Sequence, residues 1–329
     1  MSDMIYRRMG RSGLKLSVFS IGSWVTYGSQ VDAGGTRACL LAAIEGGVNF
    51  IDNAEAYAQG QAEVAVGKVV AELRRDSLVL SSKVFWGGDG PNETGLSRKH
   101  VTEACHAALR RLQTDYLDLY YCHRPDPDTP IEETVRAMDV LVRQGKVLYW
   151  GTSEWSAAQL AEAYTVAAQL GATPPSVEQP QYNLFHRKRV EQELAPLYAS
   201  HGLGTTTWSP LASGVLTGKY NDSIPAGSRL GMERMSWLQS GVTKSRVGAV
   251  RQLSAIATEL GCTTAQLALA WCANNEHVSS VITGASRPEQ VVENLKALGV
   301  LSRLTPEIYA RVTASTAAAQ DTADGEAKA

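Results

Sequence analysis

The chain has 329 residues, of which 44% are hydrophobic and 19% charged, and its 31 basic and 33 acidic side chains leave a net charge of -2. This is the balance of a globular protein with apolar material for one large core; it does not favour binding to nucleic acid, and no run of about 18 apolar residues indicates a membrane span. The five cysteines form no Cys-x-x-Cys pair and are odd in number, so we expect neither a disulfide framework nor a metal site, and a reducing cytoplasm fits best.

Short apolar runs alternate along the chain with longer segments whose apolar residues recur at helical spacing. The strand-like runs are Val18–Gly22, Val48–Ile51, Leu78–Lys83, Tyr116–Tyr121, Val147–Ser153, Ser176–Gln179, Gly204–Trp208 and Ser279–Thr283. The helix-like segments are Gly35–Glu45, Ala62–Arg74, Ser97–Leu112, Pro130–Gln144, Ala157–Leu170, Arg187–Ser200, Thr263–Asn274 and Pro288–Leu298. Eight strand-then-helix units predict parallel strands joined by crossovers, the number that closes a (β/α)₈ or TIM barrel.

Four segments fall outside this repeat. Tyr6–Ser17 is expected to form a hairpin before the first barrel strand, and Ser245–Leu260 an extra helix. Pro210–Arg246 is a long insertion after the seventh strand, and such insertions usually form binding loops or lids. We expect one barrel domain over residues 1–312 and a frayed tail over residues 313–329.

Polar residues end most of the predicted strands, and in this fold the carboxyl ends of the strands meet at the active-site face. The second strand ends in Asp52, with Tyr57 shortly after; the third ends in Lys83 and the fourth in His123. The next three strands end in Ser153, Gln179 and Trp208-Ser209.

Asp52, Tyr57, Lys83 and His123 together suit proton donation to a carbonyl oxygen. Tyrosine is a weak acid with a pKa near 10, and a neighbouring ammonium such as Lys83 favours its phenolate. Asp52 would hold Lys83, and His123 would orient the carbonyl. Taken alone, three of them have a structural alternative: capping for Asp52, packing for Tyr57 and a structural role for His123. Lys83 is harder to explain in this way, because lysine is rarely buried without a partner. Their convergence from three consecutive strands favours the chemical interpretation.

The segment from Ser279 to Asn294 predicts an anion site. A strand ends at Gly284, Ser286 and Glu289 have the spacing of a capping box, and Pro288 suits the first helical turn. The free N–H groups of a helix start bind anions, and Arg287 adds a guanidinium that matches a phosphate. This favours NADPH over NADH, whereas no G-x-G-x-x-G motif indicates a Rossmann-type site. Trp208 either stacks on a nicotinamide or plugs the barrel top.

These residues lie in stretches that resemble the aldo-keto reductase superfamily, and within it the β subunits of voltage-gated potassium channels. The stretches are GSWVTYGSQ (22–30), DNAEAYAQGQAE (52–63), SSKVFWGG (81–88), GLSRKH (95–100), RPDPDTPIEETVRAM (124–138), YWGTSEWS (149–156), TWSPLASGVLTGKY (207–220) and GASRPEQVVEN (284–294). The resemblance covers nearly the whole chain, from about Arg7 to Leu301.

The resemblance implies a catalytic tetrad of Asp52, Tyr57, Lys83 and His123, with Tyr57 as the proton donor. It implies that NADPH contacts Trp24, Gln30, Asp52, Ser153, Gln179, Trp208, Ser209, Pro210, Leu211, Lys219, Arg229, Gly284, Ser286, Arg287, Gln290, Glu293 and Asn294. Trp24 and Trp86, with Tyr57 and His123, would line the pocket of a small carbonyl substrate. A homotetramer is implied in the same way.

Two positions depart from the animal channel subunits, which carry Asn in place of His123 and Arg in place of Glu154. The complete tetrad favours an NADPH-dependent carbonyl reductase. The alternative is a regulatory subunit that binds a channel, holds NADPH and turns over little. A barrel hydrolase with paired carboxylates is a third and weaker hypothesis, because the strand ends carry one Asp beside a Lys–Tyr pair.

Overall fold

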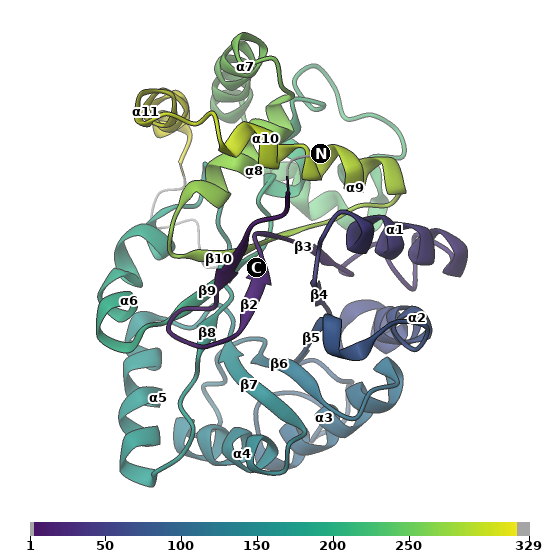
Figure 1. The fold of residues 1–329 in the computed structure, drawn as a ribbon, viewed down its shortest axis with the longest axis vertical. Coiled ribbons are helices and arrows are strands. Elements are labelled where there is room, and N and C mark those ends of the chain that lie inside the picture. The colour runs from purple at the N-terminus through teal and green to yellow at the C-terminus, as the bar shows by residue number, and fades with distance from the viewer. Residues whose placement is uncertain (1–2, 321–329) are drawn as a thin grey trace.

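The computed structural model describes residues 3–320. At its centre is a closed barrel of parallel strands in the spatial order β10-β3-β4-β5-β6-β7-β8-β9 (Figure 1). The strands are β3 Phe19–Gly22, β4 Phe50–Asp52, β5 Val79–Val84, β6 Leu117–Cys122, β7 Val147–Thr152, β8 Val177–Glu178, β9 Gly204–Thr207 and β10 Val278–Thr283. Each overlaps one predicted strand, so the predicted (β/α)₈ barrel is confirmed.

Helices surround the barrel (Figure 1), and several of them pack directly on its strands. They are α1 Ala33–Glu45, α2 Gln61–Val70, α3 Arg98–Leu112, α4 Ile131–Arg143, α5 Ala157–Leu170, α6 Ala195–His201, α8 Thr264–Asn274, α9 Pro288–Leu295 and α10 Ala297–Leu301. The helix predicted over Arg187–Ser200 is interrupted: a π-helical turn at Arg189–Glu193 precedes α6. Pro196 lies in the first turn of α6, where its missing N–H is tolerated, whereas inside a continuous helix it would break the ladder.

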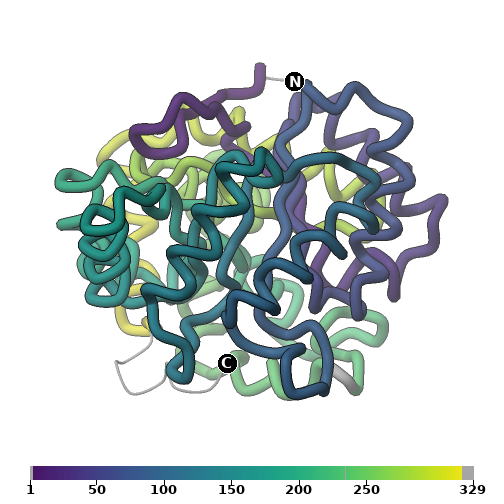
Figure 2. The backbone as a smooth tube through the Cα atoms, turned by 90° about the horizontal axis from the view of Figure 1, so that it is seen from below, coloured from purple at the N-terminus to yellow at the C-terminus, as the bar shows by residue number. Residues whose placement is uncertain are grey.

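The predicted hairpin closes the amino end of the barrel. It pairs β1 (Tyr6–Arg8) with β2 (Lys15–Ser17), and Met9 and Leu16 are buried against apolar side chains of the barrel interior. Figure 2 shows the hairpin at one end of the barrel and the segment after β9 at the opposite end. That second end, where the strands terminate, is therefore left open to build a site.

The insertion after β9 contains three 3₁₀ segments, at Ala212–Thr217, Arg229–Gly231 and Glu233–Gly241, and leads into the predicted extra helix, α7 (Lys244–Glu259). It lies at the end of the barrel opposite the hairpin, where the strands terminate (Figure 2).

The prediction of a frayed tail from residue 313 is wrong for the residues that the structure describes. Helix α11 (Pro306–Ser315) and a 3₁₀ turn (Ala317–Ala319) pack on α7, and Ser245 Oγ donates to the carbonyl of Ala318 at 3.1 Å. Val312, Thr316 and Ala319 are buried at helical spacing, so one face of this segment has a partner that sequence composition does not show. Residues 321–329 lie outside the described part of the chain.

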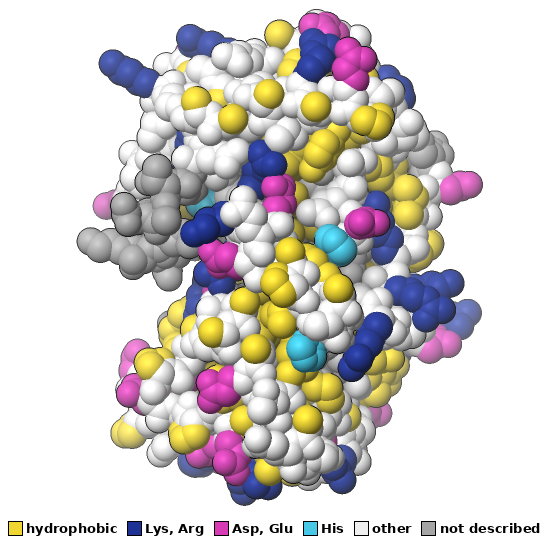
Figure 3. All heavy atoms as spheres, turned by 90° about the vertical axis from the view of Figure 1, so that its left-hand side faces the viewer, with side chains coloured by type: hydrophobic (Ala, Val, Ile, Leu, Met, Phe, Trp, Pro, Cys, Tyr) yellow, Lys and Arg dark blue, Asp and Glu magenta, His cyan; other side chains and the backbone are white. Residues whose placement is uncertain are grey.

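On the face beside α5 and α6, basic and acidic side chains are interspersed, in keeping with the net charge of -2 (Figure 3). Within residues 3–320, none of the helices has the length and apolar character needed to cross a membrane.

Candidate functional site

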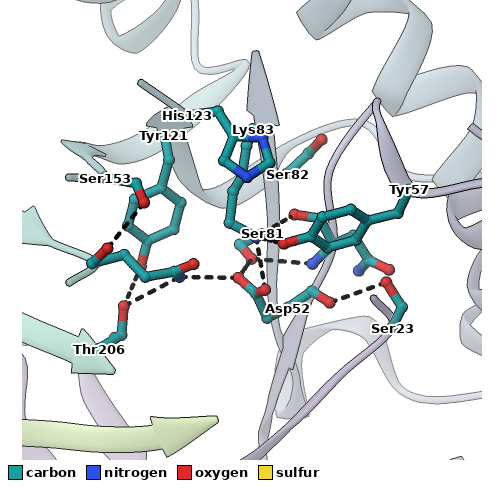
Figure 4. A network of polar contacts seen from close by, with 12 residues as sticks. Ser23, Asp52, Tyr57, Ser81, Ser82, Lys83, Tyr121, His123, Ser153 and Thr206 are labelled. Carbon is teal, nitrogen blue, oxygen red and sulfur yellow. Dashed lines mark hydrogen bonds and ion pairs between the residues drawn. The ribbon is translucent and has the colours of Figure 1, made fainter. Parts of the chain in front are cut away.

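Lys83 is the centre of a buried polar network at the carboxyl end of the barrel (Figure 4). Its side chain is fully buried, and its ammonium donates to Asp52 Oδ2 at 2.6 Å, to the Asn53 carbonyl at 2.8 Å and to Tyr57 Oη at 3.0 Å. An ammonium has three protons to donate, and here each has an acceptor. The adjacent strands β4 and β5 therefore bring together three of the predicted tetrad residues.

Asp52 is held from both sides. Its Oδ1 accepts from Ser81 Oγ at 2.9 Å and from Gln179 Nε2 at 3.1 Å, while Oδ2 faces Lys83. Its backbone carbonyl accepts from Ser23 Oγ at 3.1 Å. Asp52 thus joins four strands of the barrel and fixes where the Lys83 ammonium lies.

The loop that carries Tyr57 turns sharply after β4. Ala58 and Gln59 have positive φ angles of 49° and 54°, and Gly60 follows with 82°. Non-glycine residues rarely adopt this left-handed conformation, which costs about 1 kcal/mol each. The turn reverses the chain directly after Tyr57 and leads into α2.

The pocket around Tyr57 does not make its phenol more acidic overall. Burial and then the Asp52 carboxylate raise the pKa of Tyr57 well above the usual value, and the nearby Arg124 acts in the opposite direction. Burial also lowers the pKa of Lys83, an effect that Asp52 counteracts. Lys83 was expected to lower the pKa of Tyr57, but burial has the larger effect and raises it. The phenol therefore keeps its proton at neutral pH.

His123 follows β6 and lies edge-on to Tyr57, with ring centroids 5.7 Å apart, and edge-on to Trp86 at 5.0 Å. Burial, then the cations Lys83 and Arg124, lower the pKa of His123 well below the usual value, so the ring is neutral. Its Nδ1 is buried and has no hydrogen-bond partner among residues 3–320. Trp86 is 42% exposed, which places an aromatic surface beside this histidine.

The strand ends expected to contact NADPH lie at the same end of the barrel. Ser153 and Gln179 follow β7 and β8, and Ser153 Oγ donates to the Gln179 carbonyl at 2.8 Å. Trp24 follows β3, and Trp208, Ser209, Pro210 and Leu211 follow β9. Gln179 links this group to the buried network through its bond to Asp52.

The helix start at the end of β10 differs from the predicted capping box. Helix α9 begins at Pro288, so Arg287 occupies the N-cap position and Gln290 the third helical position. The Gln290 side chain accepts from the backbone N–H of Ser286 at 2.8 Å and from its hydroxyl at 3.1 Å, while Glu289 is exposed. Proline fixes the first helical position, and this shifts the cap by one residue from the prediction.

Three of the expected cofactor contacts are cations on segments that follow β9 and β10. Arg287 is exposed at the start of α9, and Lys219 is exposed on the loop after β9. Arg229 lies over the Trp24 ring at 5.5 Å and is partly buried, and burial lowers its pKa. It has no carboxylate partner among the residues described, and a partly buried guanidinium without a counterion suits a phosphate.

Three other residues that were expected to contact the cofactor are Gln30, Glu293 and Asn294. Gln30 is exposed on the loop between β3 and α1, and its backbone bonds Thr26. Glu293 on α9 is paired with Lys296 and accepts from Gln266, and Asn294 follows it on the same helix.

Sequence reasoning missed the polar residues one layer deeper in the barrel. Tyr121 Oη and Thr206 Oγ1 are 3.0 Å apart, and Thr206 accepts from Gln179 Nε2 at 3.3 Å. Ser81, Tyr121 and Thr206 each precede a strand-end residue by two positions, so strand alternation puts them on the same inward face. That spacing was the signal that could have found them. Asn53, buried with both side-chain polar atoms unpartnered among the residues described, carries no such signal.

Comparison with known proteins places this site in a wider context. Residues 19–317 match the model of the Aldo/keto reductase family. A probable voltage-gated potassium channel subunit beta of Oryza sativa subsp. japonica is 53% identical over 315 residues, covering 94% of this chain and 96% of the relative. The protein of the same description from Arabidopsis thaliana is 53% identical over 313 residues, covering 94% of this chain and 95% of the relative.

Proposed function

The chain belongs to the aldo/keto reductase family, and from this we propose that it is an NADPH-dependent oxidoreductase that reduces aldehydes or ketones to alcohols. The observation that carries the proposal is the buried ammonium of Lys83, which donates to both the Asp52 carboxylate and the Tyr57 phenol. A phenol bonded to an ammonium inside a barrel is suited to give up a proton and leave a stabilised phenolate.

The residues at the barrel mouth fit NADPH. Arg229, Lys219 and Arg287 supply cations for phosphates, and the start of α9 supplies backbone N–H groups. Ser153 and Gln179 supply polar groups, and Trp208 an aromatic surface, at the strand ends beside Asp52. When bound, NADPH supplies the hydride that reduces the carbonyl carbon.

Tyr57 is the proton donor in this proposal. Its raised pKa keeps the phenol protonated until the substrate oxygen becomes basic, and the proton then moves from Tyr57 Oη to that oxygen. Lys83, 3.0 Å away, stabilises the phenolate that remains, and Asp52 keeps Lys83 in place. Neutral His123 donates a hydrogen bond to the carbonyl and orients it.

The substrate class follows from the aromatic surfaces at the mouth. Trp86 beside His123, and Trp24 beneath Arg229, form flat apolar walls that suit small or aromatic aldehydes. We expect a cytoplasmic homotetramer, and light scattering on the purified protein measures the number of subunits.

A second candidate function is supported by the description of both relatives as probable potassium channel β subunits. In that case the chain would bind NADPH, dock on a channel and turn over little. The same four residues would then respond to the redox state of the bound cofactor rather than support repeated reduction of a substrate.

Two measurements with the full chain test these functions. Quenching of tryptophan fluorescence during NADPH titration reports binding, and its absence would contradict both candidates. Steady oxidation of NADPH, followed by absorbance with a panel of aliphatic and aromatic aldehydes, supports the reductase. Tight binding with only a single slow turnover would support the regulatory subunit instead.

A further inference from the structure

Glu154 connects two of the strand ends that form the site. Its Oε1 accepts from the indole Nε1 of Trp208 at 2.9 Å and from the backbone N–H of Gln181 at 2.7 Å. A hydrogen bond to an ionised carboxylate is about twice as strong as one between neutral groups. The Trp208 backbone is already bonded to the same segment, donating to Pro180 and accepting from Tyr182, each at 3.2 Å. Glu154 therefore adds a polar contact to the indole ring itself.

The backbone at Glu154 is held in an unusual conformation. Its φ angle is 60°, in the left-handed region that residues other than glycine rarely adopt. The buried Glu178 supports the turn, since its Oε1 accepts from the Trp155 N–H at 3.2 Å and its Oε2 from the hydroxyl of Thr152. A strained turn that several contacts maintain is typical of a site where a side chain must point in one direction.

The outer oxygen of Glu154 faces the π-helical turn before α6. Arg189 Nε lies 3.8 Å from Glu154 Oε2, and Arg189 Nη1 donates to the Trp155 carbonyl at 2.9 Å. Arg189 thus contacts the turn on both its side chain and its backbone. One oxygen of Glu154 is left for the guanidinium, and the other serves the two N–H donors.

We propose that Glu154 is a positioning residue that fixes the plane of the Trp208 indole for hydride transfer. This rests on the proposed function, because it takes Trp208 as the surface against which the nicotinamide ring lies. Ser153 is the residue before Glu154. The same turn therefore positions the Ser153 hydroxyl directly and the Trp208 indole through the Glu154 carboxylate. The residue that differs from the animal channel subunits at this position therefore acts on the cofactor through Trp208.

Two substitutions separate this role from a general need for the side chain. Glu154→Ala removes the acceptor of the indole N–H. Glu154→Gln keeps a carbonyl oxygen where Oε1 lies, and one carbonyl accepts two hydrogen bonds. A misplacement of about 1 Å at a reacting centre can cost a hundredfold in rate. We therefore expect roughly ten- to a hundredfold slower single-turnover hydride transfer in Glu154→Ala, near-normal transfer in Glu154→Gln, and much smaller changes in the Kd for NADPH.

Trp208→Phe provides a second, independent measurement. Phenylalanine keeps an aromatic face but has no N–H for Glu154. If the two residues act as one unit, Glu154→Ala added to Trp208→Phe should slow hydride transfer little further. Glu162→Ala, which removes an exposed carboxylate from α5, is the matched control and should behave as wild type. Circular dichroism melts identify any variant that fails to fold.

Each outcome has a definite meaning. Normal hydride transfer in Glu154→Ala, a Glu154→Gln variant as slow as Glu154→Ala, or fully additive effects with Trp208→Phe would each overturn the positioning role while leaving the reductase intact. Wild-type protein that does not bind NADPH or transfer hydride would overturn the proposed function, and the positioning role with it.

Discussion

The ammonium of Lys83 lies 3.0 Å from the phenolic oxygen of Tyr57, although the two side chains come from different units of the barrel. The same nitrogen is 2.6 Å from Asp52, so a buried carboxylate, ammonium and phenol form one continuous chain. Substituting one of these three residues should therefore change the rate of carbonyl reduction, the free energy of unfolding or both, depending on the residue.

Tyr57→Phe should abolish most carbonyl reduction while leaving NADPH binding nearly unchanged. The ring still packs against His123, but the proton donor is lost, and general acid catalysis contributes about 10²–10⁴-fold. Single-turnover measurements are required, because slow product release would hide the loss in a steady-state assay. Tyr6→Phe on the exposed hairpin is the control. Wild-type single-turnover rates in Tyr57→Phe would remove Tyr57 from this role.

Lys83→Met should impair both turnover and stability. Without the ammonium, Tyr57 loses the cation that stabilises its phenolate, and Asp52 becomes a buried carboxylate without a counterion. Breaking a buried pair in this way costs about 3 kcal/mol or more, partly offset here because Ser81 and Gln179 still donate to Asp52. Urea denaturation and stopped-flow reduction measure the two effects. Lys68→Met, which removes an exposed ammonium from α2, is the control, and equal behaviour of the two variants would contradict the account.

Arg287→Ala should weaken NADPH binding far more than NADH binding. The exposed guanidinium lies at the N-cap of α9, where backbone N–H groups already favour an anion. Losing a charge-assisted contact to the extra phosphate should cost about 1.5–3 kcal/mol, which is roughly ten- to a hundredfold in Kd. Arg8→Ala removes the same charge at the opposite end of the barrel. An unchanged ratio of the two dissociation constants would exclude the phosphate contact.

Glu178 should make the folded protein less stable as the pH rises. Burial raises the pKa of this carboxyl from 4.5 to about 8. The folded state therefore keeps a proton that the unfolded state loses above pH 4.5, and stability falls by about 1.4 kcal/mol per pH unit until the folded pKa is reached. Glu178→Gln removes this contribution. The difference in unfolding free energy between wild type and variant should decline from pH 5 to about pH 8, and parallel profiles would contradict the assignment.

The sequence predicted the barrel, and the placing of Asp52, Lys83 and His123 at the ends of its strands, because both depend on local patterns. Eight apolar runs alternating with amphipathic segments require parallel strands and crossovers, and parallel strands end at the same face. A buried lysine at a strand end requires a counterion, and Asp52 was the neighbour available. The bounds of the strands moved by one or two residues, which left the order of Asp52, Lys83 and His123 along the face intact.

Other features escaped because their signal is absent from the local pattern. The cap of α9 shifted by one residue since Pro288 fixes the first helical position, and Gln290 took the place expected for Glu289. The segment after residue 313 looked frayed by composition, but Thr316 and Ala319 are buried against α7. Composition cannot reveal a partner that arrives from another part of the chain.

By itself, the sequence determined how many strands close the barrel, which polar residues share its carboxyl face and which chemistry those residues suit, because periodicity and residue type carry that information. Only the tertiary structure decided which atoms meet: Gln179 reaches Asp52 across 127 residues, and Glu154 reaches Trp208 across 54. Such contacts form when barrel closure brings distant strand ends within hydrogen-bond distance, and the resulting burial, not the residue type, sets the direction in which the pKa of Tyr57 moves.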